Sequence, residues 1–520
     1  MGVRRRSPVV AVVAAMAVLV SACGSTGGGQ AGSDVAVGEP QRGGTVVFSN
    51  NSDAQSLDAA RCGQNANWGS CHAVYGTLLN YDVDAQEFSP GMAESFTSDD
   101  GMVWTLTLRE GVRFSDGTQF DAEAVVFNWD RTKDPANLSP AASVAKAMSY
   151  QVVDPRTVRV TLPSVNWQLP WAMNSELAFI GSPAAIRAKG PDFANAPVGA
   201  GPFRLESWTR GTRMSFVRND TYWDQPRPYL DRLEFAPIPP DVQRGNALRS
   251  GDSDLIATLV QREAEQIASE GYADAPLHHV GGVGLRFSHR NGAMADPDVR
   301  LAIAKLIDSQ QVNNAAVEGI PAATTFAAPG NPLYDPEAVF PAQDLPGAQA
   351  LIDGYRARTG GGEVVVSMRF IGGQPRGERY AQTIQAQLQR AAGLRVQLVG
   401  VDAAAYATDL SKGNYDLFLY GINGVNPDTL YLQFHTGETQ NTGGYSDPAT
   451  DAALERGRAT RDPALQLAAY KEATRHIAAN LGMYSWHYQT THLIARDDVH
   501  GVRPAYAYAF RTDLVWKEQG

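Results

Sequence analysis

The chain has 520 residues, more than one compact domain of about 100–200 residues, so two or three domains are expected. Hydrophobic residues make up 43% and charged residues 19%, which excludes a disordered chain. The net charge of −11 argues against nucleic-acid binding and against contact of the protein surface with anionic lipid. Three cysteines are too few for a disulfide-dense scaffold or a Cys₄ zinc site.

Residues 1–22 have the three parts of an export signal. Arg4, Arg5 and Arg6 supply the positive start, and the apolar run 9–20 is shorter than the roughly 20 residues of a membrane span. The small residues before Cys23 resemble a bacterial lipobox, with an ordinary secretory signal as the alternative. We therefore expect an exported protein, lipid-anchored through Cys23 to the outer face of the cell membrane.

Residues 23–42 are predicted to form a flexible tether, because they are rich in small and polar residues.

Two further cysteines, Cys62 and Cys71, lie close together in the mature chain. In an oxidising exported setting they are expected to form a disulfide, worth about 2–3 kcal/mol. Two free thiols or a metal pair remain as alternatives.

The first half of the body alternates short strands and helices. Strands are predicted at 44–49 and 102–108, and Asp121 begins a helix. Residues 152–160 read as a strand, a turn at Asp-Pro and a returning strand. The region of about 80–190 therefore resembles a mixed α+β insert.

From about residue 364 the pattern becomes strand–helix–strand. A strand at 364–368, a helix at 378–391 capped near Gly393 and a strand at 394–398 predict a parallel βαβ unit. The later predicted elements are a helix from Asp402, a strand at 415–420, a loop at 421–428, and helices at 449–458 and 464–480. Ligands of open α/β sheets bind beyond the carboxyl ends of strands, where this loop lies.

Motifs for catalysis or metal binding are absent from the sequence. There is no HExxH, phosphate-binding Gly-rich loop or Gly-x-Ser-x-Gly elbow. His487 and His492 lie on opposite faces of a predicted strand, and the acidic pair Asp99-Asp100 precedes a glycine as turn residues do. We expect no enzyme activity, cofactor or metal.

Five blocks of sequence carry a specific resemblance. They are Ala93-Glu94-Ser95-Phe96 with the run from Gly101 to Gly117 and Ala122 to Phe127; Pro197 to Phe203; Arg218 to Trp223; Ala247 to Asp254; and Asp298 to Asp308. Together they resemble the family 5 extracellular solute-binding proteins, which serve ATP-driven importers of peptides, nickel or oligosaccharides. The similarity runs in order over about residues 43–510.

The resemblance implies an α/β, two-lobed fold of the periplasmic-binding-protein type (type II, large peptide-binding class), with an α+β domain inserted in the first lobe. The expected division is 43–80, 195–283 and 490–520 for the first lobe, 81–194 for the insert and 284–489 for the second lobe. The chain is expected to cross between lobes near Arg286 and Tyr488, which would form the hinge.

Ligand contacts are expected on both walls of the cleft between the lobes. They are Asn65, Asn67 and Trp68 on one wall; Asn423, Gly424, Val425, Asn426 and Asp428 on the other; Tyr484, Trp486 and Tyr488 beside the return crossing; and Arg376 and Arg379 for a ligand carboxylate. For each of them a purely structural or exposed position is the alternative.

One residue departs from the family pattern. Peptide binders that resemble this chain often carry an acidic residue where Asn423 aligns, and that residue pairs with the peptide amino group. An amide cannot neutralise a buried ammonium. We therefore do not expect this loop to bind short peptides through their amino terminus. Longer peptides that are held through their backbone remain as ligands.

The predicted function is that of a monomeric substrate-binding lipoprotein that captures a solute, with peptide first, and delivers it to the transmembrane subunits of an ABC importer. An oligosaccharide or glycoside stacking on Trp68 or Trp486, or a metal complex, is the alternative ligand. A secreted lipoprotein hydrolase is the alternative class.

Overall fold

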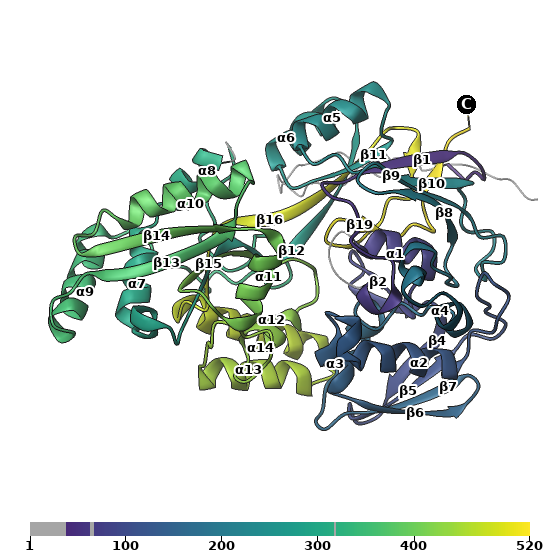
Figure 1. Cartoon of the computed structure of the whole chain (residues 1–520), viewed down its shortest axis with the longest axis horizontal. Helices are drawn as coiled ribbons and strands as arrows, with labels where there is room; N and C mark the ends of the chain where they lie inside the picture. The colour runs from purple at the N-terminus through teal and green to yellow at the C-terminus, as the bar shows by residue number, and fades with distance from the viewer. Residues whose placement is uncertain (1–37, 63–66, 317–318, 520) are drawn as a thin grey trace, which may run out of the picture. The chain divides into compact units, whose positions relative to one another are not determined.

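The computed structural model describes residues 38–62, 67–316 and 319–519. Its largest element is a ten-stranded sheet with parallel and antiparallel pairs (Figure 1). In spatial order the strands are β14 (Leu394–Val401), β13 (Val364–Ile371), β15 (Leu417–Gly421), β12 (Ala273–Phe287), β16 (Met483–Ala495), β11 (Leu255–Thr258), β1 (Thr45–Ser49), β10 (Arg232–Phe235), β9 (Arg213–Arg218) and β8 (Phe203–Thr209). This mixed α/β architecture is the fold class expected from the sequence.

Two long strands run through the middle of this sheet. β12 has 15 residues and β16 has 13, and they pair antiparallel from Ala273 opposite Ala495 to Arg286 opposite Met483. The backbones approach closely at Gly284, where a Cβ atom would lie 1.9 Å from the Tyr484 carbonyl oxygen. Only glycine fits there. The pairing joins the strands on either side of it into one sheet.

The described residues form three large hydrophobic cores and a small fourth one around Ile256 and Ile267. The first core draws on residues 46–75, 178–257 and 493–515, and the second core on residues 280–486. The insert core, from residues 78–200, contains the four-stranded antiparallel sheet and helix α2. That sheet has the order β4 (Ala93–Ser98), β5 (Val103–Leu108), β7 (Thr157–Thr161) and β6 (Ser149–Asp154).

The elements predicted for the first half of the body are confirmed. β1, β5 and the β6–β7 hairpin lie where the residue patterns placed them. α2 (Ala122–Lys133) begins directly after Asp121, whose Oδ1 accepts a hydrogen bond from the Ala124 amide at 2.9 Å. This carboxylate satisfies one of the free amides of the first helical turn.

The βαβ unit is also confirmed, with one correction. β13 and β14 pair in parallel along their whole length, from Val364 opposite Leu394 to Ile371 opposite Val401. The helix between them, α10 (Pro375–Leu388), begins and ends earlier than the predicted 378–391. Pro375 starts it because proline favours the first helical position, and Gly393 (φ +82°) lies in the turn before β14.

The other helices pack around these sheets. They are α1 (Asn67–Tyr75), α3 (Ala142–Lys146), α4 (Pro183–Lys189), α5 (Asp241–Ser250), α6 (Gln261–Ser269), α7 (Pro297–Leu306), α8 (Ser309–Ala316), α9 (Leu345–Arg358), α11 (Ala403–Lys412), α12 (Thr429–Phe434), α13 (Pro448–Ala459) and α14 (Pro463–Ala479). The short strand pairs are β2 (Leu79–Asp82) with β3 (Glu87–Pro90), β17 (Val499–His500) with β20 (Trp516–Lys517), and β18 (Pro504–Tyr506) with β19 (Ala509–Phe510). Among the described helices, none has the length and apolar character needed to cross a membrane.

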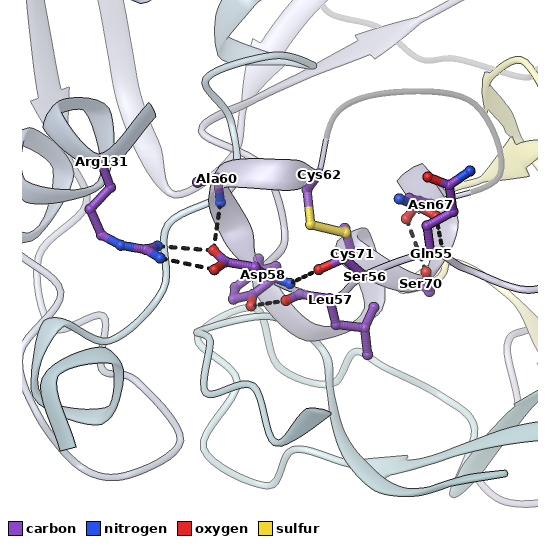
Figure 2. The surroundings of a disulfide bond; sticks show 11 residues. Gln55, Ser56, Leu57, Asp58, Ala60, Cys62, Asn67, Ser70, Cys71 and Arg131 are labelled. Carbon is purple, nitrogen blue, oxygen red and sulfur yellow. Dashed lines mark hydrogen bonds and ion pairs between the residues drawn. A yellow bond between two sulfur atoms is a disulfide. The ribbon is translucent and has the colours of Figure 1, made fainter. Parts of the chain in front are cut away.

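The disulfide between Cys62 and Cys71 is present, as expected, and ties the segment before α1 to the helix (Figure 2). Close to it, Asp58 accepts two hydrogen bonds of 2.9 Å from the Arg131 guanidinium of α2, while the Tyr75 hydroxyl donates to the Leu57 carbonyl at 2.5 Å. The bridge therefore lies where the first core meets the insert core.

Removing this bridge should destabilise the protein. The double variant C62A/C71A is expected to lose about 2–3 kcal/mol of unfolding free energy, because the unfolded chain regains the freedom of a short closed loop. Urea unfolding followed by tryptophan fluorescence measures the difference. Dithiothreitol should shift the wild-type midpoint and leave that of the double variant unchanged; an equal response of both proteins would contradict the expectation.

Three buried histidines make stability depend on pH. Burial lowers the pKa of His72 to about 4, of His279 to about 3 and of His487 to about 4. Each ring also forms a hydrogen bond with a polar neighbour: the Thr512 hydroxyl for His72, the Thr491 hydroxyl for His279 and the Asn313 amide oxygen for His487. The Asp513 carboxylate opposes the lowering of the His72 pKa, but the effect of burial is larger.

These imidazoles bind protons more readily once the chain unfolds, where their pKa returns to about 6.5. Their contribution to stability is therefore complete above pH 6.5 and is lost as the pH falls toward 4, by up to about 1.4 kcal/mol per pH unit for each histidine. Thermal unfolding should show a lower midpoint at pH 5 than at pH 7. A midpoint that stays constant over this range would contradict the assignment.

Candidate functional site

The candidate site is built around the loop of residues 422–428 that follows β15. Its centre is pinned to the crossing strand β12: the Gly424 amide donates to His279 Nδ1 at 2.7 Å, and the Val280 amide donates to the Gly424 carbonyl at 2.9 Å. Gly424 has a φ of +99°, a conformation that favours glycine. Its α-carbon faces the Tyr506 ring, which a Cβ atom would meet at 3.7 Å.

The polar side chains of this loop are engaged by the protein itself. Asn423 Oδ1 accepts a hydrogen bond from the Gln489 side chain of β16, and Asn426 Oδ1 accepts one from the Asp428 amide at 2.9 Å. Asp428 is only 6% exposed. Its two carboxylate oxygens each accept a 2.7 Å hydrogen bond from Arg458, and one also accepts the Tyr470 hydroxyl at 3.0 Å. The loop forms a rigid wall without a free charge.

A cavity of about 700 Å³ lies beside this wall. From the second core it is lined by Val425 and Pro427 of the loop and by the start of α14, and from β12 by residues 276–278. Its other side comes from the insert core and is aromatic, with Trp167, Trp171, Tyr81 and Phe88. The lining also includes the charged residues Asp84 and Arg461. Both the volume and a mainly aromatic side with a few polar groups are typical of sites for small molecules.

Direct contacts hold the cores together around this region. The Trp167 amide of the insert donates to the Arg458 carbonyl of α13 at 2.8 Å. On another side Arg376, at the start of α10, forms an ion pair with Asp241 at the start of α5. Arg376 is therefore paired within the protein, while Arg379 is exposed on α10.

Of the aromatic residues predicted beside the return crossing, Tyr484 and Trp486 are buried within the second core and Tyr488 is partly exposed. Trp486 is 0% exposed, and Tyr484 is buried with its hydroxyl 3.0 Å from that of Ser309. The Tyr488 hydroxyl lies 2.8 Å from the Thr325 hydroxyl. Alternation along β16 does not present Trp486 to a ligand, because this strand lies in the middle of a sheet covered on both faces.

Of the residues predicted for the opposite wall, Asn67 and Trp68 make contacts within the protein. Asn67 begins α1 and its side chain accepts the Gln55 amide at 3.0 Å, while Asn65 lies outside the described residues. Trp68 is 0% exposed, donates to the Asn174 carbonyl at 3.2 Å and stacks on Tyr506 with 6.4 Å between ring centroids. Trp68 and Trp486 thus offer no exposed face for a sugar. Cys23, the residue predicted to carry the lipid, also lies outside the described residues.

Glu176, which carries no sequence motif, lies in the insert between the segment 169–173 and α4. It follows the 3₁₀ helix η3 (Leu169–Met173), is partly exposed, and receives a hydrogen bond from the Ser175 hydroxyl. Burial raises the pKa of its carboxyl; the Ser175 hydrogen bond opposes this rise, and the negative charge of Asp428 adds to it. No motif marks this glutamate, because its relation to Asp428 exists only in the folded chain.

The sequence and the fold of this chain are similar to those of known proteins. Residues 87–443 match the family model described as bacterial extracellular solute-binding proteins, family 5. The glutathione-binding protein GsiB of Salmonella paratyphi A is 26% identical over 454 residues, which cover 82% of this chain and 86% of GsiB.

Two solved structures share the fold. The periplasmic binding protein AgaA of Agrobacterium tumefaciens R10, in complex with agropinic acid, has a TM-score of 0.79 and 25% identity, and the match covers 92% of this chain and 99% of AgaA. DppA of Helicobacter pylori, in complex with the peptide STSA, has a TM-score of 0.78 and 23% identity, with coverage of 92% and 99%.

The buried pair at the end of the loop should be a main source of stability for this wall. R458A leaves the Asp428 carboxylate buried without its cation, and an unfolding free energy about 3–5 kcal/mol lower is expected. R461A is the matched control, because Arg461 is an exposed arginine of the adjoining turn, and should change stability by less than about 0.5 kcal/mol. Equal thermal midpoints of the two variants would show that the Arg458–Asp428 pair does not contribute to the stability of the protein.

Proposed function

Because this chain belongs to the bacterial extracellular solute-binding proteins of family 5, we propose that it captures a small solute outside the cell and delivers it to the transmembrane subunits of an ABC importer. The observation that carries this proposal is the cavity of about 700 Å³ between the 422–428 loop and the aromatic side of the insert core. A solute there touches residues of two cores at once.

The three cores correspond, in this proposal, to the first lobe, the insert and the second lobe, with the boundaries 43–80, 195–283 and 490–520; 81–194; and 284–489. β12 and β16 connect the lobes. A solute bound between them favours the closed form only through contacts that the open form lacks. The Arg376–Asp241 ion pair and the Trp167–Arg458 hydrogen bond would form in the same step.

The solute is proposed to be a peptide. This choice is supported by relatives whose names or bound ligands are glutathione and the peptide STSA. A peptide backbone offers donors and acceptors along its length, which suits a wall without a free charge. The chain acts as a transport component, anchored to the outer face of the membrane by a lipid on Cys23 as part of the same proposal.

Thermal unfolding of the lipid-free mature protein tests the function. The panel holds glutathione, random peptides of four and of eight residues, maltooligosaccharides and nickel–histidine, and mass spectrometry follows whether each compound stays intact. A ligand at about a thousand times its dissociation constant should stabilise the protein by about 4 kcal/mol.

Stabilisation by peptides that stay intact is the expected result. A response to sugars or nickel alone would keep the transport role and overturn the peptide. Cleavage of the peptides would favour a hydrolase. If no compound of the panel stabilises the protein, the proposal that it captures a solute is overturned.

A further inference from the structure

A second cavity lies at the other end of β15 from the candidate site. It has a volume of about 560 Å³, and the residues that line it all come from the region of the second core. The loop of the candidate site follows β15, whereas this cavity is lined by residues 412–416, which precede the strand. Arg290 and Asn291, after β12, and Ser367 and Arg369 of β13 complete the lining. The two cavities share no lining residue.

Arg290 is held in a fixed position in this cavity. Its Nη2 donates to the Thr442 carbonyl at 2.7 Å and to the Lys412 carbonyl at 3.4 Å. The guanidinium lies so close to Gly413 that a Cβ atom there would be 1.9 Å from Nη2, and a Cβ atom at Gly444 would be 3.1 Å from Cδ. Main-chain carbonyls carry no net charge, and no carboxylate of the described residues forms an ion pair with Arg290. Its positive charge is therefore not neutralised.

Two further charges of the cavity have no partner of opposite charge. Lys412, the last residue of α11, is exposed and forms no ion pair within the described part of the chain. The Asp416 carboxylate accepts the Ser367 amide at 2.8 Å and the Ser367 hydroxyl at 2.7 Å, and no described cation pairs with it. Arg369 is neutralised by Asp409, with 2.7 Å between Nε and Oδ2. Two positive charges and one negative charge are therefore left without a partner.

This combination suits a ligand with two carboxylates and one ammonium group. Arginine binds a carboxylate through two parallel N–H donors, and lysine binds one as a point charge. A carboxylate of the protein binds an ammonium group through a charge-assisted hydrogen bond. A simple anion would leave Asp416 without a partner, and an amino acid with one carboxylate would leave one of the two cations without a partner.

We propose that this cavity is a second ligand site, and that it binds a small amino dicarboxylate, such as glutamate or aspartate, through Arg290, Lys412 and Asp416. The site is separate from the one that captures the solute, because no lining residue is shared. Arg290 and Asp416 are already positioned by bonds within the protein, so binding does not have to order these two side chains.

Four small molecules test the charges of the ligand. L-glutamate carries all three groups, L-glutamine lacks the second carboxylate, glutarate lacks the ammonium group, and inorganic phosphate is a simple anion. Titration calorimetry on the lipid-free mature protein measures their dissociation constants. The wild type should bind glutamate roughly 10–100-fold more tightly than glutamine or glutarate, as expected for loss of one charged hydrogen bond.

Variants of the chain test where glutamate binds. R290Q, K412Q and D416N should each bind it roughly 10–100-fold more weakly than the wild type. R204Q and D220N are the matched controls, because Arg204 and Asp220 are exposed residues outside the cavity, and they should keep the wild-type affinity. K412Q changes an exposed side chain, so its result stands even if R290Q does not fold.

The proposal and the proposed function fail separately. Absence of glutamate binding to the wild type would overturn the second site and leave solute capture standing. Unchanged affinity in the three cavity variants would show that glutamate binds elsewhere and would overturn it as well. Glutarate or phosphate bound as tightly as glutamate, with no loss in D416N, would overturn the amino dicarboxylate and replace it with a simple anion.

Discussion

The pairing of β12 with β16 is the constraint on which the rest of the structure depends. These strands belong to the ten-stranded sheet and connect the β13–β15 region of the second core to β11 and β1 of the first. Both also supply anchors for the loop: His279 of β12 binds the Gly424 amide, and Gln489 of β16 binds the Asn423 side chain. The position of one wall of the site is therefore set by the same strands that join the cores.

This arrangement explains why the loop is polar and yet carries no free charge. The side chains of Asn423, Asn426 and Asp428 are used to hold the backbone and to bury the Arg458 guanidinium. Because these side chains are paired within the protein, the loop offers no free charge to a ligand.

Local patterns predicted much of the fold. Asp121 marked the start of α2 because a carboxylate caps the first turn, and the alternation of 364–398 marked a parallel βαβ unit. The proximity of Cys62 and Cys71 in sequence indicated their disulfide. The site residues were harder to predict. The sequence places Trp68 and Trp486 near the expected cleft walls, but both are fully buried, since large apolar rings gain most by leaving water.

The sequence by itself determined the class of protein, because the motif blocks and the strand and helix periodicities depend on residues that are close together along the chain. The tertiary structure decided which polar groups are free to meet a solute. Asp428 looks available in the sequence and is neutralised by Arg458, and Trp486 looks available for stacking and is fully buried. Charge neutralisation depends on distance in space between segments far apart in sequence, and only the folded chain sets that distance.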